Sequence, residues 1–226
     1  MAFPTTVSGS YGWEKQTTSA QRQVLGAEMV FADGRKYRYV ENGGTAIEEG
    51  MIVASEAPAG NHDEDLAVAT TAAGASSVTV TLGATAAAKN LYAEGYLFFN
   101  LPTLSTAGSR VFYKIKSHPQ ADGSATLALT LDEPDKTVIA VTNGTETAGL
   151  IKSPYKDIVV APAAVAGRFV GLAACQIAAN YFGWVQVAGM GVAAIDGTPA
   201  VGTLVGASSN HAGSLLAVGA DTTPAL

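Results

Sequence analysis

The sequence predicts an all-β fold, an antiparallel β-sandwich or barrel with a small β subdomain and an extended N-terminal arm. Short segments alternate apolar and polar residues, which is the period of a half-buried strand. Gly, Pro, Asn and Asp separate these segments at intervals of about 10 residues, as in sandwiches and barrels. No amphipathic pattern is long enough for a helical bundle or coiled coil.

Residues 1–28 are predicted to form the extended arm. They are rich in Thr, Ser, Gln and Gly and show little periodicity, so we expect them to need a partner surface to become ordered. Trp13 lies in this polar segment. A Trp in such an arm usually anchors it by burying its ring, on its own domain or on a neighbouring subunit.

Residues 29–75 are predicted to form the small β subdomain. In RKYRYV, cations alternate with Tyr37 and Tyr39, as on a strand with one wet face. Asn42, Gly43 and Gly44 follow and are expected to supply the positive φ of a tight turn. A second short strand pair is expected around Gly50.

Residues 76–226 are predicted to form the main sandwich or barrel domain. The segment ATLALTL places Leu127, Leu129 and Leu131 on one face of a strand. Ala84 to Glu94 is rich in helix formers and precedes Gly95, so a short connecting helix is expected there. The predicted strands are 78–82, 110–116, 125–131, 136–141 and 157–160.

Composition and charge exclude several classes of partner. The chain has 226 residues and a net charge of −6, and its one cluster of cations is RKYR at 35–38, so we expect no nucleic-acid partner. No apolar run reaches the ~18 residues that span a bilayer, so no membrane partner is expected. The start lacks the pattern of a secretory signal, which predicts synthesis in a cytoplasm. The single Cys175, in an apolar run, is predicted to be a buried, inert thiol.

The C-terminal part of the chain is unusually poor in charge. After Ala161 only Arg168, Asp196 and Asp221 are charged, and glycine recurs throughout. A charge-poor, β-patterned segment is either a core packed on both faces or a surface that meets other subunits. Both interpretations favour an assembly over a solitary enzyme.

Motifs of catalysis and of cofactor binding are incomplete. GMGVAA at 189–194 has the glycine spacing of a dinucleotide site, but a turn follows instead of a helix, and the acidic residue ~20 positions later is missing. NHDED at 61–65 lacks the glycine and glutamate of a calcium loop, and an acidic loop in solvent is the simpler interpretation. His118 and His211 look like turn residues. We therefore predict no catalytic, cofactor or metal residues and no enzymatic activity.

The segment YFGWVQVAG at 181–189 has two interpretations, a stacking platform for a ligand or the inside of a sheet. On a strand, Phe182, Trp184 and Gln186 share one face, while Gly183 and Val185 share the other. Because both faces are largely apolar, a strand buried on both sides, or on one side and against a neighbouring subunit, is favoured.

A series of motifs, in order, resembles structural proteins of tailed bacteriophages, especially marine and cyanobacterial ones. The motifs are LGAEMVFADGRKYRYVENGGTAIEEG (25–50), KNLYAEGYLFF (89–99), LTLDEPD (129–135), SPYKDIVV (153–160) and YFGWVQVAG. Among these virion components, the resemblance points to head decoration, or cement, proteins. The resemblance implies a homotrimer that binds the outer surface of the major capsid protein lattice, stabilises the head and resides on the virion. It brings no catalytic residues, and Glu94 stands where that pattern has a glycine.

The resemblance and the aromatic pattern together predict the residues that contact other subunits or the capsid. These are Trp13, Tyr92, Tyr155, Trp184 and Gln186. Three alternatives remain open: another virion component such as a coat, tail or fibre-base protein; a carbohydrate-binding virion module that uses Trp184; and a virion hydrolase that uses His62, Asp63 and Asp65.

Overall fold

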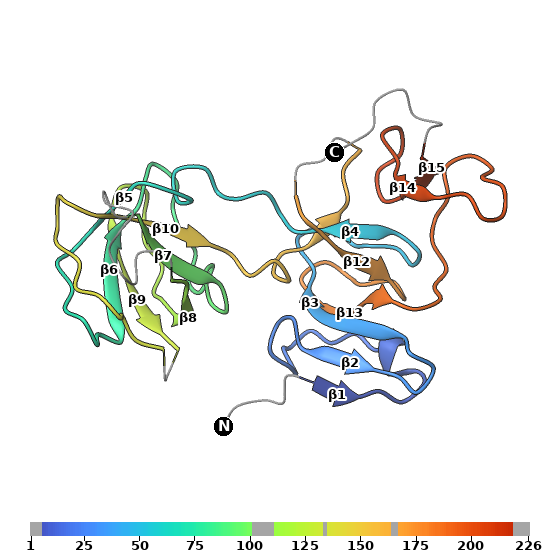
Figure 1. Ribbon diagram of the computed structural model, residues 1–226, viewed down its shortest axis with the longest axis horizontal. Coiled ribbons are helices and arrows are strands. Elements are labelled where there is room, and N and C mark those ends of the chain that lie inside the picture. Colours follow the sequence, from blue (N-terminus) through green and yellow to red (C-terminus); the bar gives the residue numbers. More distant parts are fainter. Residues whose placement is uncertain (1–5, 101–110, 133–134, 164–166, 219–226) are drawn as a thin grey trace. The chain divides into compact units, whose positions relative to one another are not determined.

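The chain folds into two compact β units, each described here by itself. The structure, a computed structural model, describes residues 6–100, 111–132, 135–163 and 167–218. The sheet unit comprises residues 1–57 and 154–226, and the barrel unit comprises residues 58–153 (Figure 1). Within the described ranges the only helical segment is a 3-10 turn, η1 (Trp13–Lys15), and no helix is long and apolar enough to cross a membrane. The predicted all-β class is confirmed.

The boundaries of the units differ from the predicted ones at residues 28 and 75. The barrel unit is inserted between two parts of the sheet unit, because strands from both ends of the chain pair with each other. Phe182 to Ala188 pairs with Lys36 to Glu41 in one sheet. Local strand patterns do not reveal pairing between strands that are far apart in the sequence. The predicted boundaries therefore divided the chain into consecutive segments and missed the inserted barrel unit.

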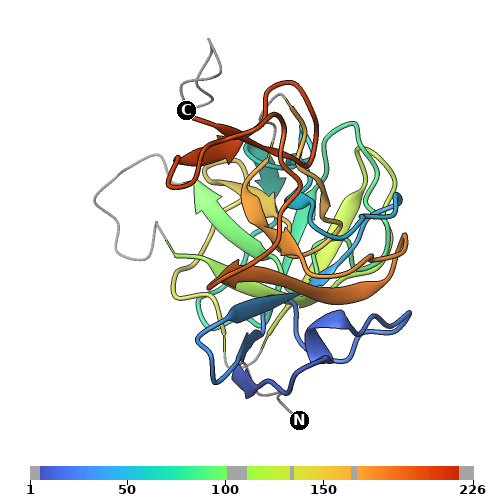
Figure 2. The same ribbon diagram turned by 90° about the vertical axis from the view of Figure 1, so that its right-hand side faces the viewer.

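The sheet unit is built on a seven-stranded sheet in the order β1-β2-β3-β13-β12-β4-β11 (Figures 1 and 2). All neighbouring strands are antiparallel except β1 and β2. The strands are β1 (Thr6–Ser8), β2 (Glu28–Val30), β3 (Lys36–Glu41), β4 (Ile52–Ala54), β11 (Val159–Val160), β12 (Phe169–Ala173) and β13 (Phe182–Ala188).

The N-terminal segment lies on its own sheet, which supplies the partner surface that the predicted arm was expected to need. β1 pairs with β2, and the Gly9 N–H donates to the Val30 carbonyl at 2.8 Å. Further along, Thr18 and Phe182 exchange backbone hydrogen bonds of 3.0 and 2.8 Å. Described residues 6–28 therefore find their partner surface within the chain, while residues 1–5 lie outside the described residues.

Residues 182–186 of strand β13 are buried on both faces, as one interpretation of YFGWVQVAG predicted, whereas Val187 and Ala188 at its end are exposed. On one face Trp184 and Phe182 pack with Tyr39, whose ring centroid lies 5.0 Å from that of Trp184 in an edge-to-face arrangement. On the other face Val185 packs with Val40. Cations on β3 are more exposed than Tyr37 and Tyr39, which confirms the predicted alternation.

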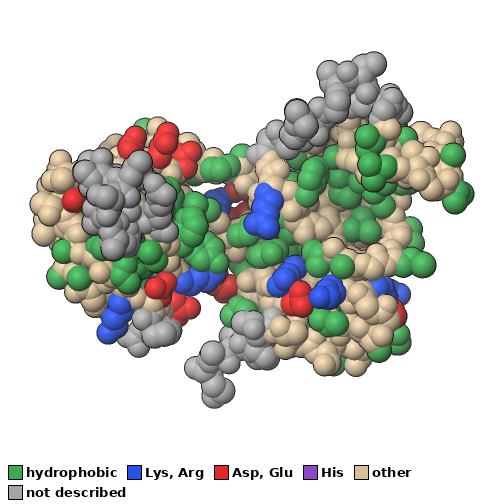
Figure 3. Space-filling view, in the orientation of Figure 1, with side chains coloured by type: hydrophobic (Ala, Val, Ile, Leu, Met, Phe, Trp, Pro, Cys, Tyr) green, Lys and Arg blue, Asp and Glu red, His purple; other side chains and the backbone are tan. Residues whose placement is uncertain are grey.

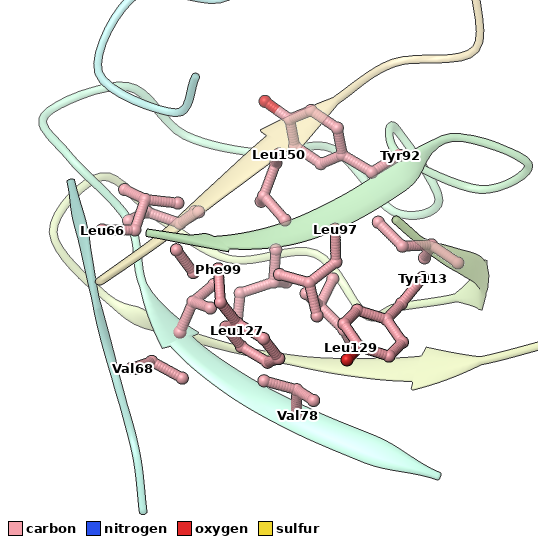
Figure 4. Packing of buried hydrophobic residues seen from close by; sticks show 14 of the residues in the cluster. Leu66, Val68, Val78, Tyr92, Leu97, Phe99, Tyr113, Leu127, Leu129 and Leu150 are labelled. Carbon is pink, nitrogen blue, oxygen red and sulfur yellow. The ribbon is translucent and has the colours of Figure 1, made fainter. Parts of the chain in front are cut away.

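The barrel unit is a closed barrel in the order β10-β5-β6-β9-β8-β7. Its side chains fill the interior as a continuous apolar core (Figure 4). Leu127, Leu129 and Leu131 are fully buried there, as predicted. The strands are β5 (Leu66–Val68), β6 (Ser77–Thr81), β7 (Tyr96–Asn100), β8 (Tyr113–Ser117), β9 (Thr126–Leu131) and β10 (Thr147–Ile151).

Three local predictions were wrong. Residues 84–94 form bends, a bridge at Ala87 and consecutive turns at 89–94 instead of a helix, with Asn90 and Glu94 at φ of 59° and 60°. Residues 136–141 form no strand, only a single bridge at Val141. The Asn42 turn has no positive φ; instead Asn42 is buried and its amide donates to the carbonyls of Thr45 and Ile177. In each case contacts with distant segments override the local propensity.

A bridge-turn motif occurs six times among the residues that the structure describes. In each copy a buried residue makes an isolated antiparallel bridge, and the residue three positions later has positive φ. The copies pair, and the two bridge residues of each pair exchange both backbone hydrogen bonds. The pairs are Ile47 with Ile177 in the sheet unit, and Thr71 with Val141 and Ala87 with Ala121 in the barrel unit; the positive-φ residues are Gly50, Asn180, Gly74, Gly144, Asn90 and Ser124.

Candidate interaction surface

Residues 190–218 of the sheet unit form a small lobe, here called the C-terminal lobe. It contains a separate two-stranded sheet, β14 (Val205–Ala207) with β15 (Leu215–Ala217). Several hydrogen bonds attach it to the larger sheet. Ala194 N–H donates to the Gly50 carbonyl at 2.6 Å, and Gly213 N–H donates to the Ala161 carbonyl at 2.8 Å. The lobe is thus a fixed extension of the sheet unit.

Large apolar side chains of the lobe project into solvent. We call Met190, Val192, Val201, Leu204 and Val218 the apolar surface; the first four are at least 73% exposed. Figure 3 shows hydrophobic and uncharged side chains over β14 and β15, at the upper right of the view. A two-stranded sheet is only marginally stable alone, and exposed apolar side chains in such number are typical of a protein–protein contact.

Asp196, the one acidic residue of the lobe at 190–218, is hydrogen-bonded within the lobe. Asp196 Oδ2 accepts hydrogen bonds from the Ser208 hydroxyl at 2.6 Å and from His211 Nδ1 at 3.1 Å. The bond from Ser208, followed by that from His211, holds the pKa of Asp196 below its ordinary value. The carboxylate therefore remains ionised and bound within the lobe, and the lobe offers a partner few free charges.

Asp196, Ser208 and His211 have the residue types of a hydrolytic triad but not its geometry. The Ser208 hydroxyl donates to Asp196 and accepts the backbone N–H groups of Asn210 and His211 at 3.0 and 3.1 Å. Its proton is therefore directed away from the imidazole, and the side chain is buried. A triad needs a serine that donates to the histidine. The network fixes the loop at 208–211, in keeping with the prediction that His211 is a turn residue.

The five predicted contact residues have different environments. Trp13 is 46% exposed, whereas Tyr92, Trp184 and Gln186 are buried within the chain. Tyr155 is half-buried against Gly26. Only Trp13 thus offers a large exposed face. The apolar surface was not predicted, although its apolar residues in a charge-poor, glycine-rich segment were a signal for it.

The structure separates the residues of the predicted hydrolase alternative. His62 is fully buried; its Nδ1 accepts the Tyr92 hydroxyl at 2.5 Å, and its Nε2 donates to the Thr85 carbonyl at 2.9 Å. Asp63 and Asp65 point to solvent. Across the part of the chain that is described, no group of His, Cys, Asp and Glu is arranged to hold a metal ion.

The remaining motifs have structural explanations. Gly189 has a φ of 89° and opens a loop, and no helix in the described residues 190–218 presents its N-terminus to a pyrophosphate. Cys175 is half-buried, and burial, together with the charges of Glu14 and Glu49, raises the pKa of its thiol.

Comparison of the chain with protein-family models, with curated protein sequences and with solved structures finds no match.

Proposed function

We propose that this protein is a bacteriophage capsid decoration protein that binds the outer surface of the major capsid protein lattice and stabilises the head. The exposed apolar surface of the C-terminal lobe is the observation that carries the proposal, since it fits a subunit of an assembly better than a solitary protein. The ordered series of phage-like motifs supplies the kind of assembly.

In this proposal the apolar surface forms contacts between copies of the chain, in a homotrimer. Copies with a net charge of −6 repel one another, and a contact surface that is nearly free of charge adds no local like-charge repulsion. The C-terminal lobe provides such a surface, because its Asp196 is already bound to Ser208 and His211. Burial of each fully exposed Val, Leu or Met side chain contributes about 1.5–3 kcal/mol.

A trimer suits the outside of an icosahedral shell, because threefold and quasi-threefold positions recur over its surface. Three copies joined together present three capsid-binding surfaces at once. Weak individual contacts then add up to a high effective affinity. Such a subunit strengthens the junctions between coat proteins without any chemical step, so the proposed activity is binding alone.

The stacking-platform alternative loses its main support, because Trp184 packs against Tyr39 within the chain and is not exposed. The other virion positions differ from capsid decoration in copy number. Quantitative mass spectrometry of purified particles tests the proposal. We expect hundreds of copies in a fixed ratio to the major capsid protein, whereas a few to a dozen copies would assign the chain to the tail, portal or fibre base.

A further inference from the structure

The sheet unit contains a cavity of about 460 Å³ between η1 and the segment 190–194. We propose that this cavity binds an ammonium or guanidinium group carried on an alkyl stem, with Glu14 as its charged partner. Cavities of this size with mostly apolar walls and a few convergent polar groups are typical ligand sites. The proposal goes beyond the role at the capsid, but Met190 and Val192 of the apolar surface also line this cavity.

The central observation is a buried carboxylate that lacks a full set of partners. Glu14 lines the cavity and is 5% exposed. Its Oε2 accepts the Gly12 N–H at 2.7 Å, but its Oε1 accepts no hydrogen bond from any residue that the structure describes. A carboxylate has about four acceptor positions, and a buried one is costly unless it is paired.

The nearest cation, Arg35, is already engaged by other groups. Its Nη1 lies 3.9 Å from Glu14 Oε1, beyond hydrogen-bond distance. Its Nε donates to Asp33 at 2.7 Å and its Nη1 donates to the Tyr37 hydroxyl at 2.8 Å. The ring of Phe31 lies 4.9 Å from the guanidinium carbon and holds it further. Arg35 therefore neutralises Asp33 first and leaves Glu14 with acceptor capacity for a second cation.

The local charges favour a cationic ligand over an anionic one. Three carboxylates, on Glu14, Asp33 and Glu49, lie at or beside the cavity, and two cations, on Lys15 and Arg35, oppose them. Lys15 and Glu49 are both exposed to solvent, where their charges are screened, so the buried Glu14 is the main charge that faces a ligand. An ammonium group would meet a negative potential at Glu14.

The remaining walls suit an alkyl stem. Leu172, Met190 and Val192 supply aliphatic surface. The Gln186 amide donates to the carbonyls of Ala188 and Met190 at 3.0 and 2.8 Å, which holds the loop at the rim of the cavity. A lysine or arginine side chain of a partner protein has this chemistry, as does a free alkyl amine.

The test is a calorimetric titration of the full chain with cadaverine, with 1-pentanol and pentanoate as the neutral and anionic controls. We expect saturable binding of cadaverine alone, weakened roughly 10- to 100-fold by Glu14→Gln, which removes a charge-assisted hydrogen bond. The control Glu28→Gln alters a carboxylate that pairs with Arg38 away from the cavity, and it should leave binding unchanged. Equal binding by wild type and Glu14→Gln, or by cadaverine and pentanol, would overturn the proposal.

Two additional measurements keep the test decisive. If Glu14→Gln unfolds the sheet unit, Glu49→Gln replaces it, because Glu49 is exposed and its loss should still weaken amine binding. A missing effect of Glu49→Gln in that case counts against the proposal. Titration with Nα-acetyl-lysine amide identifies the source of the ligand: affinity equal to that of cadaverine supports a protein side chain, and weaker affinity supports a free amine.

Discussion

Ile47 and Ile177 exchange both backbone hydrogen bonds, at N···O distances of 3.0 and 2.8 Å, and both side chains are fully buried. Gly50 and Asn180, three residues after each, have φ of 76° and 60°. The same bridge-turn arrangement occurs twice more in the barrel unit. These paired turns fix where the following strands begin, so the residue at each positive-φ position matters for stability.

Ser124 is the bridge-turn residue least suited to its conformation, with a φ of 61°. Ser124→Gly should stabilise the barrel unit by about 0.5–1 kcal/mol, because glycine has no Cβ to strain a left-handed backbone. Gly74→Ser should destabilise it by a similar amount; no atom lies within 4 Å of an added Cβ there, so the effect is conformational. Chemical denaturation followed by hydrogen exchange of barrel peptides measures both changes.

Ser76→Gly is the matched control, since Ser76 is exposed and does not have positive φ. There the same substitution should be neutral or destabilising, because glycine gains entropy in the unfolded chain. Equal stabilisation by Ser124→Gly and Ser76→Gly would contradict the conformational explanation.

The barrel unit should lose stability as the pH falls below about 6.5. His118 Nε2 accepts the Tyr92 N–H at 2.9 Å, and its Nδ1 donates to the Pro119 carbonyl at 2.7 Å, so the folded state needs a neutral ring. Burial lowers the pKa of His118. As the pH falls, His118 is therefore protonated in the unfolded chain before it is protonated in the folded one. The free energy of unfolding decreases over the pH range between the unfolded-state pKa and the lower folded-state pKa.

Thermal unfolding of the barrel unit at pH 7.5 and 5.5 measures this effect. His118→Gln should reduce the difference between the two pH values, while His211→Gln, at an exposed ring in the sheet unit, should leave the barrel transition unchanged. An undiminished pH dependence in His118→Gln would show that another group titrates.

The two tryptophans should report different environments. Trp184 is buried against Tyr39, and Trp13 is half exposed. The Trp13→Phe variant should emit at short wavelength and resist quenching by acrylamide, whereas Trp184→Phe should emit at longer wavelength and quench readily. Ready quenching of Trp184 in Trp13→Phe would restore the stacking-platform interpretation of YFGWVQVAG.

The apolar surface should drive self-association. Native mass spectrometry should find a trimer for the wild type and a monomer for Val201→Lys/Leu204→Lys, because two buried cations in each contact repel and lose hydration. Val138→Lys, at an exposed apolar side chain of the barrel unit, is the matched control and should remain a trimer. A monomeric wild type at high micromolar concentration would contradict this prediction.

Much of the fold could be predicted from local patterns. The alternation in ATLALTL correctly predicted strand β9 and its buried face, and the alternation in RKYRYV correctly predicted strand β3. The division into units could not be predicted in this way, because it depends on pairing between β3 and β13 across an inserted barrel. The bridge-turn motif has only a weak sequence pattern, in which a small or branched residue is followed three positions later by Gly, Asn or Ser.

The candidate surfaces were harder to predict. Aromatic residues such as Tyr92 and Trp184 were expected at contacts but fill the cores, because large rings gain most from complete burial. The exposure of Val201 and Leu204 depends on the fold of the C-terminal lobe. The residue type alone does not show whether an apolar side chain is buried or exposed. Glu14 is buried by a tertiary contact of η1 that its polar sequence does not indicate.

Capsid occupancy is the most direct test of the proposed function. Purified chain is added to heads that lack it, and bound copies per major capsid protein are counted after sedimentation. We expect saturation at a fixed, small-integer ratio for the wild type and for Val138→Lys, and a loss of occupancy for Val201→Lys/Leu204→Lys, which loses the avidity of the trimer. Absence of saturable binding by the wild type would contradict the role as a decoration protein.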